Sequence, residues 1–128
     1  MRVLTWAEFD EAVYRLASTY EGRAFNGVYG FPRGGLCLAV ALSHQLELPL
    51  LHEIEPDCLV VDDVYETGRT LAPASQYEGV ECAVWISKAE PTWFRVVEVV
   101  TSPEWLLFPW ENAATAANDE DAYRASRE

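Results

Sequence analysis

The segment Cys58–Leu71 reads CLVVDDVYETGRTL, and it decides the fold class of the chain. Its first four residues form a short apolar run, as a buried parallel strand requires. Two carboxylates, Asp62 and Asp63, follow where we expect the strand to leave the sheet, and a Thr-Gly-Arg-Thr turn then leads into a helix predicted from about Gly68 to Tyr77. Carboxylates accept hydrogen bonds from hydroxyl groups, while the amides and positive dipole end of a helix N-terminus bind phosphate. The segment therefore predicts a site for a ligand that carries hydroxyls and a phosphate.

The acid pair also has a purely structural interpretation. Asp62 and Asp63 could be solvated turn residues that cap the next helix, because burying two acids behind four apolar residues is costly without partners. Taken alone, the two interpretations have equal support. The Thr67–Thr70 turn beside the pair favours ligand binding, since ligands of open α/β sheets lie beyond the carboxyl ends of the strands.

A second glycine-rich turn, Phe31–Gly35, reads FPRGG. It lies between a predicted strand, Phe25–Gly30, and a predicted helix from Leu36 to about Leu46. Exposed amides in such a turn commonly bind anions, and Arg33 adds a positive charge. The same turn could equally be a structural connection between strand and helix.

The other elements continue an alternation of strands and helices. Thr5 and Glu8 fit a capping box at the start of an amphipathic helix that Gly22 can end. Further strands are predicted at Pro49–Leu51, Glu81–Ile86 and Arg95–Val100. The alternation predicts a single-domain α/β fold over residues 1–111, with a mainly parallel central sheet flanked by helices. Residues 112–128 are rich in alanine and acids, so we expect a loosely held helix or a frayed tail there.

Composition restricts the compartment and the partners. The 128 residues carry a formal net charge of −12, and so acidic a surface repels nucleic acid. We also expect no membrane partner, because no apolar run approaches the length of a span and no signal peptide opens the chain. The three cysteines, Cys37, Cys58 and Cys82, are odd in number and lack CxxC spacing, which disfavours a disulfide framework or a zinc site. These features predict a cytoplasmic protein with reduced, buried thiols.

Two of these motifs together resemble those of type I phosphoribosyltransferases. Residues 61–70, VDDVYETGRT, are similar to the family's phosphoribosyl diphosphate motif, and FPRGG is similar to its pyrophosphate loop. The resemblance implies that Asp62 and Asp63 bind the ribose, partly through Mg²⁺, and that Arg33 and Gly34 bind the pyrophosphate. It further implies that the 5′-phosphate is surrounded by Glu66, Thr67, Gly68, Arg69 and Thr70.

A third match resembles the purine end of xanthine-guanine phosphoribosyltransferases. It comprises Trp85–Lys88, which reads WISK, and Pro103–Glu111, which reads PEWLLFPWE. The resemblance implies that Lys88 faces the exocyclic oxygen of a 6-oxopurine and that Trp105 stacks on the ring. The alternative for Trp105 is a hydrophobic cover over a sheet edge.

The sequence departs from the family's pattern at two places. Glu66 stands where the family usually has an aspartate proposed to assist proton transfer at the purine, and its side chain is one methylene longer. Between Leu51 and Cys58 the family usually inserts a long hairpin with a mobile loop that closes over the site, whereas only His52–Asp57 is present here. A neighbouring subunit of a homo-oligomer is one way to supply the missing cover.

The resemblance therefore implies an enzyme or a binding module. The enzyme would transfer the phosphoribosyl group of phosphoribosyl diphosphate to a 6-oxopurine base and release pyrophosphate, with Mg²⁺ held by Asp62 and Asp63. Glu66 and Asp63 are the candidate catalytic residues. The alternative is a non-catalytic module of the same fold that binds a nucleotide or phosphoribosyl diphosphate.

Overall fold

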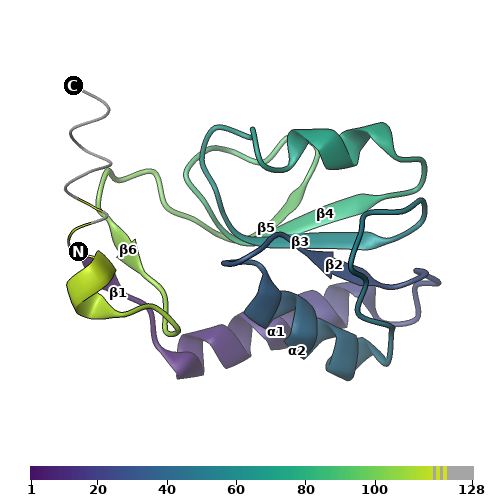
Figure 1. Cartoon of the computed structure of the whole chain (residues 1–128), viewed down its shortest axis with the longest axis horizontal. Helices are drawn as coiled ribbons and strands as arrows, with labels where there is room; N and C mark the ends of the chain where they lie inside the picture. The colour runs from purple at the N-terminus through teal and green to yellow at the C-terminus, as the bar shows by residue number, and fades with distance from the viewer. Residues whose placement is uncertain (117, 119, 121–128) are drawn as a thin grey trace. The chain divides into compact units, whose positions relative to one another are not determined.

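The computed structural model describes residues 1–116, 118 and 120 (Figure 1). Its internal contacts fall into two compact units, Met1–Glu11 with Ser102–Glu128, and Ala12–Thr101. Each unit is described by itself below. The boundary predicted after residue 111 stays a prediction, and much of the predicted acidic tail lies outside the described residues.

The larger unit, Ala12–Thr101, is built on a four-stranded sheet. Its strands are β2 (Val28–Gly30), β3 (Leu59–Tyr65), β4 (Glu81–Ser87) and β5 (Arg95–Val99). They lie in the order β2-β3-β4-β5, and every neighbouring pair is parallel. The predicted α/β fold with a mainly parallel sheet is therefore confirmed.

Helices cover both faces of this sheet. Figure 1 shows α2 (Leu36–Leu46) on one face and η1 (Ala72–Gln76), a short 3₁₀ helix, on the other. Buried apolar side chains of α2 pack towards β2 and β3. The η1 face holds a cluster of buried side chains: Cys58, Val60, Leu71, Ala74, Cys82, Val84 and Phe94. Because both faces are covered, the start of β3 is a continuous apolar run rather than an alternating one.

The helix predicted from Gly68 to Tyr77 is wrong. Bends and turns occupy residues 66–71, and the helix that follows is only the 3₁₀ segment η1. Gly68 has a φ of 84°, which lies outside the helical region, and Pro73 falls in the first turn of η1, where its missing N–H is tolerated. The site therefore has no α-helix N-terminus at this turn, and a phosphate bound here would use the amides and side chains of the turn itself.

Three predicted strands differ from the structure by more than one residue, whereas β4 and β5 each differ by a single residue. The first is shorter than predicted and comprises only Val28–Gly30. The segment Pro49–Leu51 contributes only an isolated parallel bridge between Leu50 and Val28. Conversely, β3 does not end at Val61 but continues through the acid pair. Parallel pairing with β4 holds these added residues in the sheet.

The smaller unit contains two strands that the sequence did not reveal. β1 (Arg2–Val3) and β6 (Leu106–Leu107) form a parallel pair. The backbone N–H of Arg2 donates to the carbonyl of Trp105 at 2.8 Å. Two-residue strands are too short to show a hydrophobic period, so the sequence pattern could not predict them.

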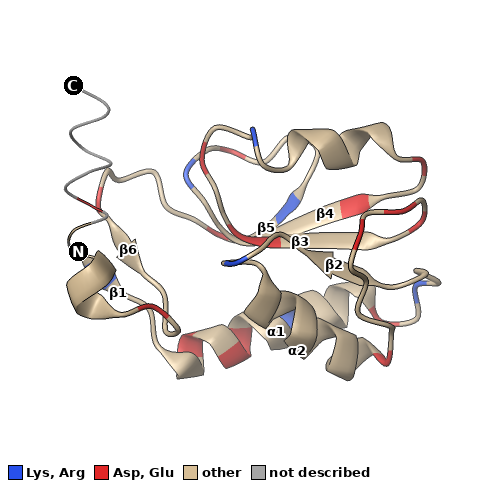
Figure 2. Ribbon diagram, viewed as in Figure 1, with Lys and Arg blue, Asp and Glu red and all other residues tan. Residues whose placement is uncertain are grey.

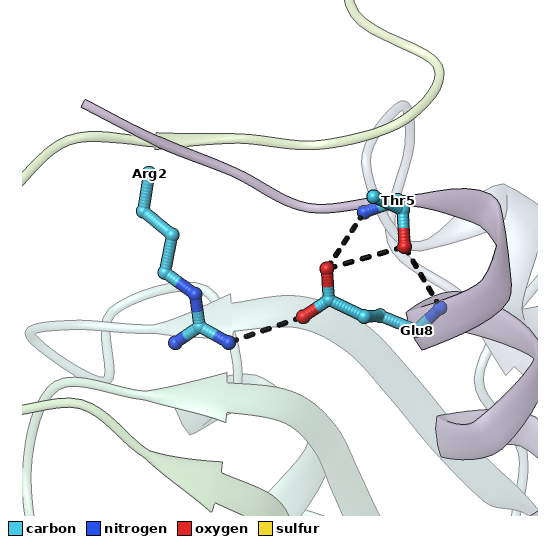
Figure 3. A network of polar contacts seen from close by, with 3 residues as sticks. All are labelled: Arg2, Thr5 and Glu8. Atoms are coloured by element: carbon cyan, nitrogen blue, oxygen red, sulfur yellow. Dashed lines mark hydrogen bonds and ion pairs between the residues drawn. The ribbon is translucent and has the colours of Figure 1, made fainter.

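The predicted capping box at the start of α1 (Trp6–Tyr20) is confirmed. The Thr5 N–H donates to Glu8 Oε1 at 3.1 Å, and the Glu8 N–H donates to Thr5 Oγ1 at 3.1 Å (Figure 3). Arg2 lies 3.3 Å from the other carboxylate oxygen of Glu8. The backbone hydrogen bond from Thr5 lowers the pKa of Glu8.

Aromatic packing accounts for Trp110 in the smaller unit. Trp110 stacks on Phe108 with ring centroids 5.2 Å apart, and it meets Phe9 edge to face at 5.8 Å. The Phe108 N–H donates to Glu111 Oε1 at 2.8 Å. These contacts give Trp110 and Glu111 a structural role in this unit. After Asn112, whose side chain caps the next turn, residues 113–116 are helical.

Truncating the cap should destabilise the chain measurably. Thr5→Ala removes the acceptor of the Glu8 N–H, and loss of an N-cap hydroxyl costs about 1 kcal/mol. Thr19→Ala is the matched control, because that hydroxyl donates only to the Arg15 carbonyl within the helix. Because the Glu8 pKa is lowered in the folded chain, its contribution is full above its ordinary pKa of 4.5 and is lost as the pH falls through the folded value. Urea denaturation checks this, and equal losses in both variants would contradict it.

Among the residues that the structure describes, no helix is long and apolar enough to cross a membrane. The three cysteines are free. Cys58 and Cys82 are buried, as predicted, but Cys37 is only partly buried at the start of α2.

Candidate functional site

Three loops leave the sheet of the larger unit at its carboxyl edge, because its strands are parallel. Residues 31–35 follow β2, residues 66–71 follow β3, and residues 88–94 follow β4. Figure 2 shows basic positions in these loops and an acidic stretch at the end of β3. Most of the predicted site residues therefore lie at one edge of one sheet. This is where open α/β sheets bind their ligands.

The acid pair lies inside β3, not beyond it. Asp62 pairs with Val84 of β4, and only 6% of its surface is exposed. Each carboxylate accepts from the next backbone amide: Asp63 N–H donates to Asp62 Oδ1 at 2.9 Å, and Val64 N–H donates to Asp63 Oδ1 at 2.8 Å. The alternative of two solvated turn acids is therefore wrong for Asp62. A buried carboxylate is costly unless a proton or a cation neutralises its charge.

The electrostatics of the pair follow from this burial. Burial, and then the charge of Asp63, raises the pKa of Asp62 to about 8. Burial also raises the pKa of Asp63, and the nearby charge of Glu66 adds to this effect. A pair of this kind holds a proton near neutral pH until a cation replaces it.

The FPRGG turn packs directly against the acid pair. A Cβ built on Gly34 would overlap the carboxylate of Asp63, and one on Gly35 would come within 2.8 Å of the Val61 carbonyl. The Phe31 N–H donates to that same carbonyl at 3.2 Å. The peptide bond between Pro32 and Arg33 is cis. The FPRGG turn and the motif at residues 61–70 are thus joined through Gly34 and Asp63, which are 29 residues apart in the sequence.

The turn after β3 presents its polar groups to solvent. Glu66, Thr67, Arg69 and Thr70 are exposed, and Gly68 is partly buried. The Arg69 N–H donates to Thr67 Oγ1 at 3.4 Å, and the Ala72 N–H donates to the Gly68 carbonyl at 2.9 Å. The amides of residues 67, 68 and 70 can therefore serve an anion.

Two guanidinium groups of this edge lack an anionic partner. Within residues 1–116, 118 and 120, neither Arg33 nor Arg69 forms an ion pair. Both side chains are exposed. In a chain with a net charge of −12, unpaired cations in two loops of one edge favour an anionic ligand over a cationic one.

The two predicted purine-binding residues fall in different units. Lys88 begins the loop after β4, and its N–H donates to the Tyr65 carbonyl at 2.8 Å. Trp105 belongs to the smaller unit, where it precedes β6. Their pairing at one base therefore stays a prediction.

The acid pair suits a divalent cation of the kind predicted. In the described part of the chain no group of three or more His, Cys, Asp and Glu could hold a metal ion. Mg²⁺, however, is usually bound through one or two carboxylates together with substrate phosphates and waters, so a pair is enough. The raised pKa of Asp62 marks a carboxylate that lacks a compensating charge. The donor set therefore fits Mg²⁺ held jointly by the protein and a phosphorylated ligand.

No hairpin covers this edge between Leu51 and β3. Residues 52–57 contain only bends and turns, as their small number predicted. Sequence reasoning, in contrast, gave no role to Tyr65, the last residue of β3. Its ring stacks on Phe94 with centroids 4.1 Å apart and an interplanar angle of 22°. The signal that the sequence offered was the position of Tyr65, an aromatic residue between the acid pair and Gly68.

Comparisons with solved structures identify the fold. Purine phosphoribosyltransferase from Pyrococcus horikoshii Ot3 is similar with a TM-score of 0.74 and 27% identity, covering 87% of this chain and 93% of that one. Xanthine-guanine-hypoxanthine phosphoribosyltransferase from Helicobacter pylori is similar with a TM-score of 0.70 and 17% identity, over 92% and 98% of the two chains. No protein-family model and no curated protein sequence matches the chain.

A third similar structure is a hypothetical protein from Neisseria gonorrhoeae with bound ppGpp. Its TM-score is 0.68 at 16% identity, and the match covers 97% of each chain. With the parallel order β2-β3-β4-β5 and its flanking helices, the chain has the type I phosphoribosyltransferase fold. The resemblance seen in the sequence motifs is thereby confirmed at the level of the fold.

Proposed function

We propose that this protein is a phosphoribosyltransferase that transfers the phosphoribosyl group of phosphoribosyl diphosphate to a 6-oxopurine base. The observation that carries the proposal is the packing of Gly34 against Asp63. This contact places the FPRGG turn, the proposed pyrophosphate site, beside Asp62 and Asp63, the proposed ribose site. Residues 66–70, here called the phosphate-type turn, follow at the same edge of the sheet. A ligand with phosphates at both ends of a ribose is the ligand that such an arrangement fits.

Each part of the site has a role in this proposal. The amides and side chains of residues 66–70 bind the 5′-phosphate, and Asp62 and Asp63 orient the ribose hydroxyls. Arg33 and the amide of Gly34 receive the pyrophosphate as the bond from the anomeric carbon to its oxygen breaks. Mg²⁺, when bound, would offset the negative charge of that leaving group. Glu66, which lies close enough to raise the Asp63 pKa, is the candidate acid/base for the purine proton.

The choice of base in this proposal rests on Lys88, which follows β4, and on Trp105. A lysine beside a carbonyl oxygen favours a 6-oxopurine over adenine, and Trp105 is the proposed stacking partner. The names of the Pyrococcus and Helicobacter proteins, a purine and a xanthine-guanine-hypoxanthine phosphoribosyltransferase, support this choice. A homo-oligomer in which a neighbouring subunit covers the site is part of the proposal.

A second function is a nucleotide-binding module without turnover. The short link at residues 52–57 favours it, because a reaction that forms an oxocarbenium-like centre needs water excluded. The similar Neisseria structure, named for its bound ppGpp, supports a guanine nucleotide with two phosphorylated ends as the ligand of such a module.

One assay separates the two functions. The protein is incubated with phosphoribosyl diphosphate, Mg²⁺ and hypoxanthine, xanthine, guanine or adenine, and mononucleotide formation is followed. We expect turnover with a 6-oxopurine, none with adenine, and loss of most of it in Asp63→Asn. In Lys88→Met the preference for 6-oxopurines should fall by about tenfold or more, since one hydrogen bond to the base is lost. Binding of phosphoribosyl diphosphate or ppGpp without turnover would instead establish the module.

A further inference from the structure

Tyr65 lies between the phosphate-type turn and the loop that carries Lys88. The end of its side chain packs against the turn: the hydroxyl oxygen is the atom nearest to the position that a Cβ on Gly68 would take, and the ring carbon Cζ lies 2.9 Å from that position. Any side chain at residue 68 would therefore collide with this ring. The ring is in turn held by Phe94, on which it stacks at 4.1 Å.

Phe94 anchors this stack in the core. It is 8% exposed and belongs to the buried cluster that includes Val60, Cys82 and Val84 of β3 and β4. Tyr65 itself is partly buried against the same cluster. The stacked rings of Tyr65 and Phe94, which pack against the strands, therefore set the position of the turn relative to the sheet.

The backbone of Tyr65 reaches the other half of the site. As the last residue of β3, it pairs with Ser87 of β4, and its carbonyl accepts the Lys88 N–H at 2.8 Å. One residue thus contacts the phosphate-type turn through its ring and the base-side loop through its carbonyl.

The Tyr65 ring supports a turn that has no α-helix behind it. The hydrogen bonds given above, at 3.4 and 2.9 Å, join the turn only to its own residues and to Ala72. Four of its residues, 66, 67, 69 and 70, are exposed. A phosphate cradle made of backbone amides is effective only when those amides are held in place before the ligand binds.

We propose that the ring of Tyr65 is a positioning element that holds the turn at Gly68 in register with Lys88, so that the phosphate and the base of one ligand are bound at a fixed separation. This inference deepens the proposed function and rests on it for the identity of the ligand. The role is one of packing and not of hydrogen bonding: the Tyr65 hydroxyl oxygen lies nearest to the Cβ position of Gly68, but within the described residues it makes no hydrogen bond.

The test compares Tyr65→Phe, Tyr65→Leu and the control Tyr14→Ala, which truncates a tyrosine that is 68% exposed. Calorimetry gives the affinity for phosphoribosyl diphosphate with Mg²⁺, and amide hydrogen exchange is measured at residues 66–70 and 88. Tyr65→Phe should bind within about twofold of the parent, whereas Tyr65→Leu, which fills the core but cannot stack, should bind about tenfold or more weakly. Exchange in Tyr65→Leu should accelerate at the turn and at Lys88 ahead of the interior of β3 and β4.

Two outcomes would overturn the inference. One is a parent protein that binds phosphoribosyl diphosphate with Tyr65→Leu binding equally well, which would leave the proposed function standing. The other is uniform acceleration of exchange across the sheet, as a merely structural residue would give. If the parent does not bind phosphoribosyl diphosphate, the proposed function fails, and the exchange pattern still decides whether Tyr65 positions the turn.

Discussion

Asp62→Asn is expected to raise the melting temperature of the protein near pH 8 while removing its use of phosphoribosyl diphosphate. The carboxyl group is buried in β3, and burial with the charge of Asp63 raises its pKa to about 8 from an ordinary value of 3.8. Because the pKa of Asp62 is higher in the folded chain, its protonated carboxyl group contributes stability that is fully present below pH 3.8. That contribution is lost as the pH rises through about 8. Asparagine is neutral at every pH and keeps an Oδ1 that can accept the Asp63 N–H, so it avoids this loss.

The expected gain therefore grows between about pH 4 and pH 8 and is small below pH 4. Near pH 8 it should be on the order of 1 to 3 kcal/mol, seen as a rise of several degrees in the melting temperature. Activity should fall by roughly 100-fold, because the ribose and Mg²⁺ lose a carboxylate. Asp10→Asn, at an exposed position, is the control and should change neither quantity. A variant that melts lower at pH 8 and remains active would contradict the described environment of Asp62.

Gly34→Ala is expected to disable ligand binding more than it destabilises the fold. The new methyl group would occupy the place of the Asp63 carboxylate, so the turn or the carboxylate must move. Overpacking of this kind costs typically 1 to 3 kcal/mol of stability, and a displacement of about 1 Å in a binding site can cost about 100-fold in activity. Calorimetric affinity for phosphoribosyl diphosphate is the measurement.

Gly22→Ala separates the two effects. Gly22 has a φ of 79° and open space around the position of a Cβ, so alanine there strains the backbone without touching the acid pair. It should lower the melting temperature but leave the affinity unchanged. Equal affinities for Gly34→Ala and the parent would mean that the FPRGG turn is a structural connection only.

The sequence was most informative where an element is long or its chemistry is local. The capping box of Thr5 and Glu8 could be predicted because its two hydrogen bonds join residues three apart. The parallel sheet followed from apolar runs such as Leu59–Val61, which only a strand buried on both faces requires. The α2 bounds were predicted closely for a similar reason, as the helix starts at a glycine-rich turn.

Other features depend on contacts between distant residues and could not be predicted. Two adjacent acids indicated the end of a strand, but pairing with Val84 keeps Asp62 inside β3 despite the cost of burial. The contact of Gly34 with Asp63 and the stack of Tyr65 on Phe94 join residues from separate strands. The prediction of a helix after Gly68 is wrong, because the positive φ of Gly68 and the proline at residue 73 leave room only for a 3₁₀ helix.

The most direct measurement is a calorimetric titration of the protein with phosphoribosyl diphosphate, with and without Mg²⁺, in the parent and in Asp63→Asn. The described edge predicts saturable binding of one ligand per chain that strengthens with Mg²⁺ and is lost in the variant. Binding should also strengthen as the pH rises towards about 8, because the raised pKa of Asp62 means that a proton must leave before the cation is held. Absence of saturable binding by the parent under these conditions, or unchanged binding in Asp63→Asn, would contradict the assignment of this edge as a phosphoribosyl site.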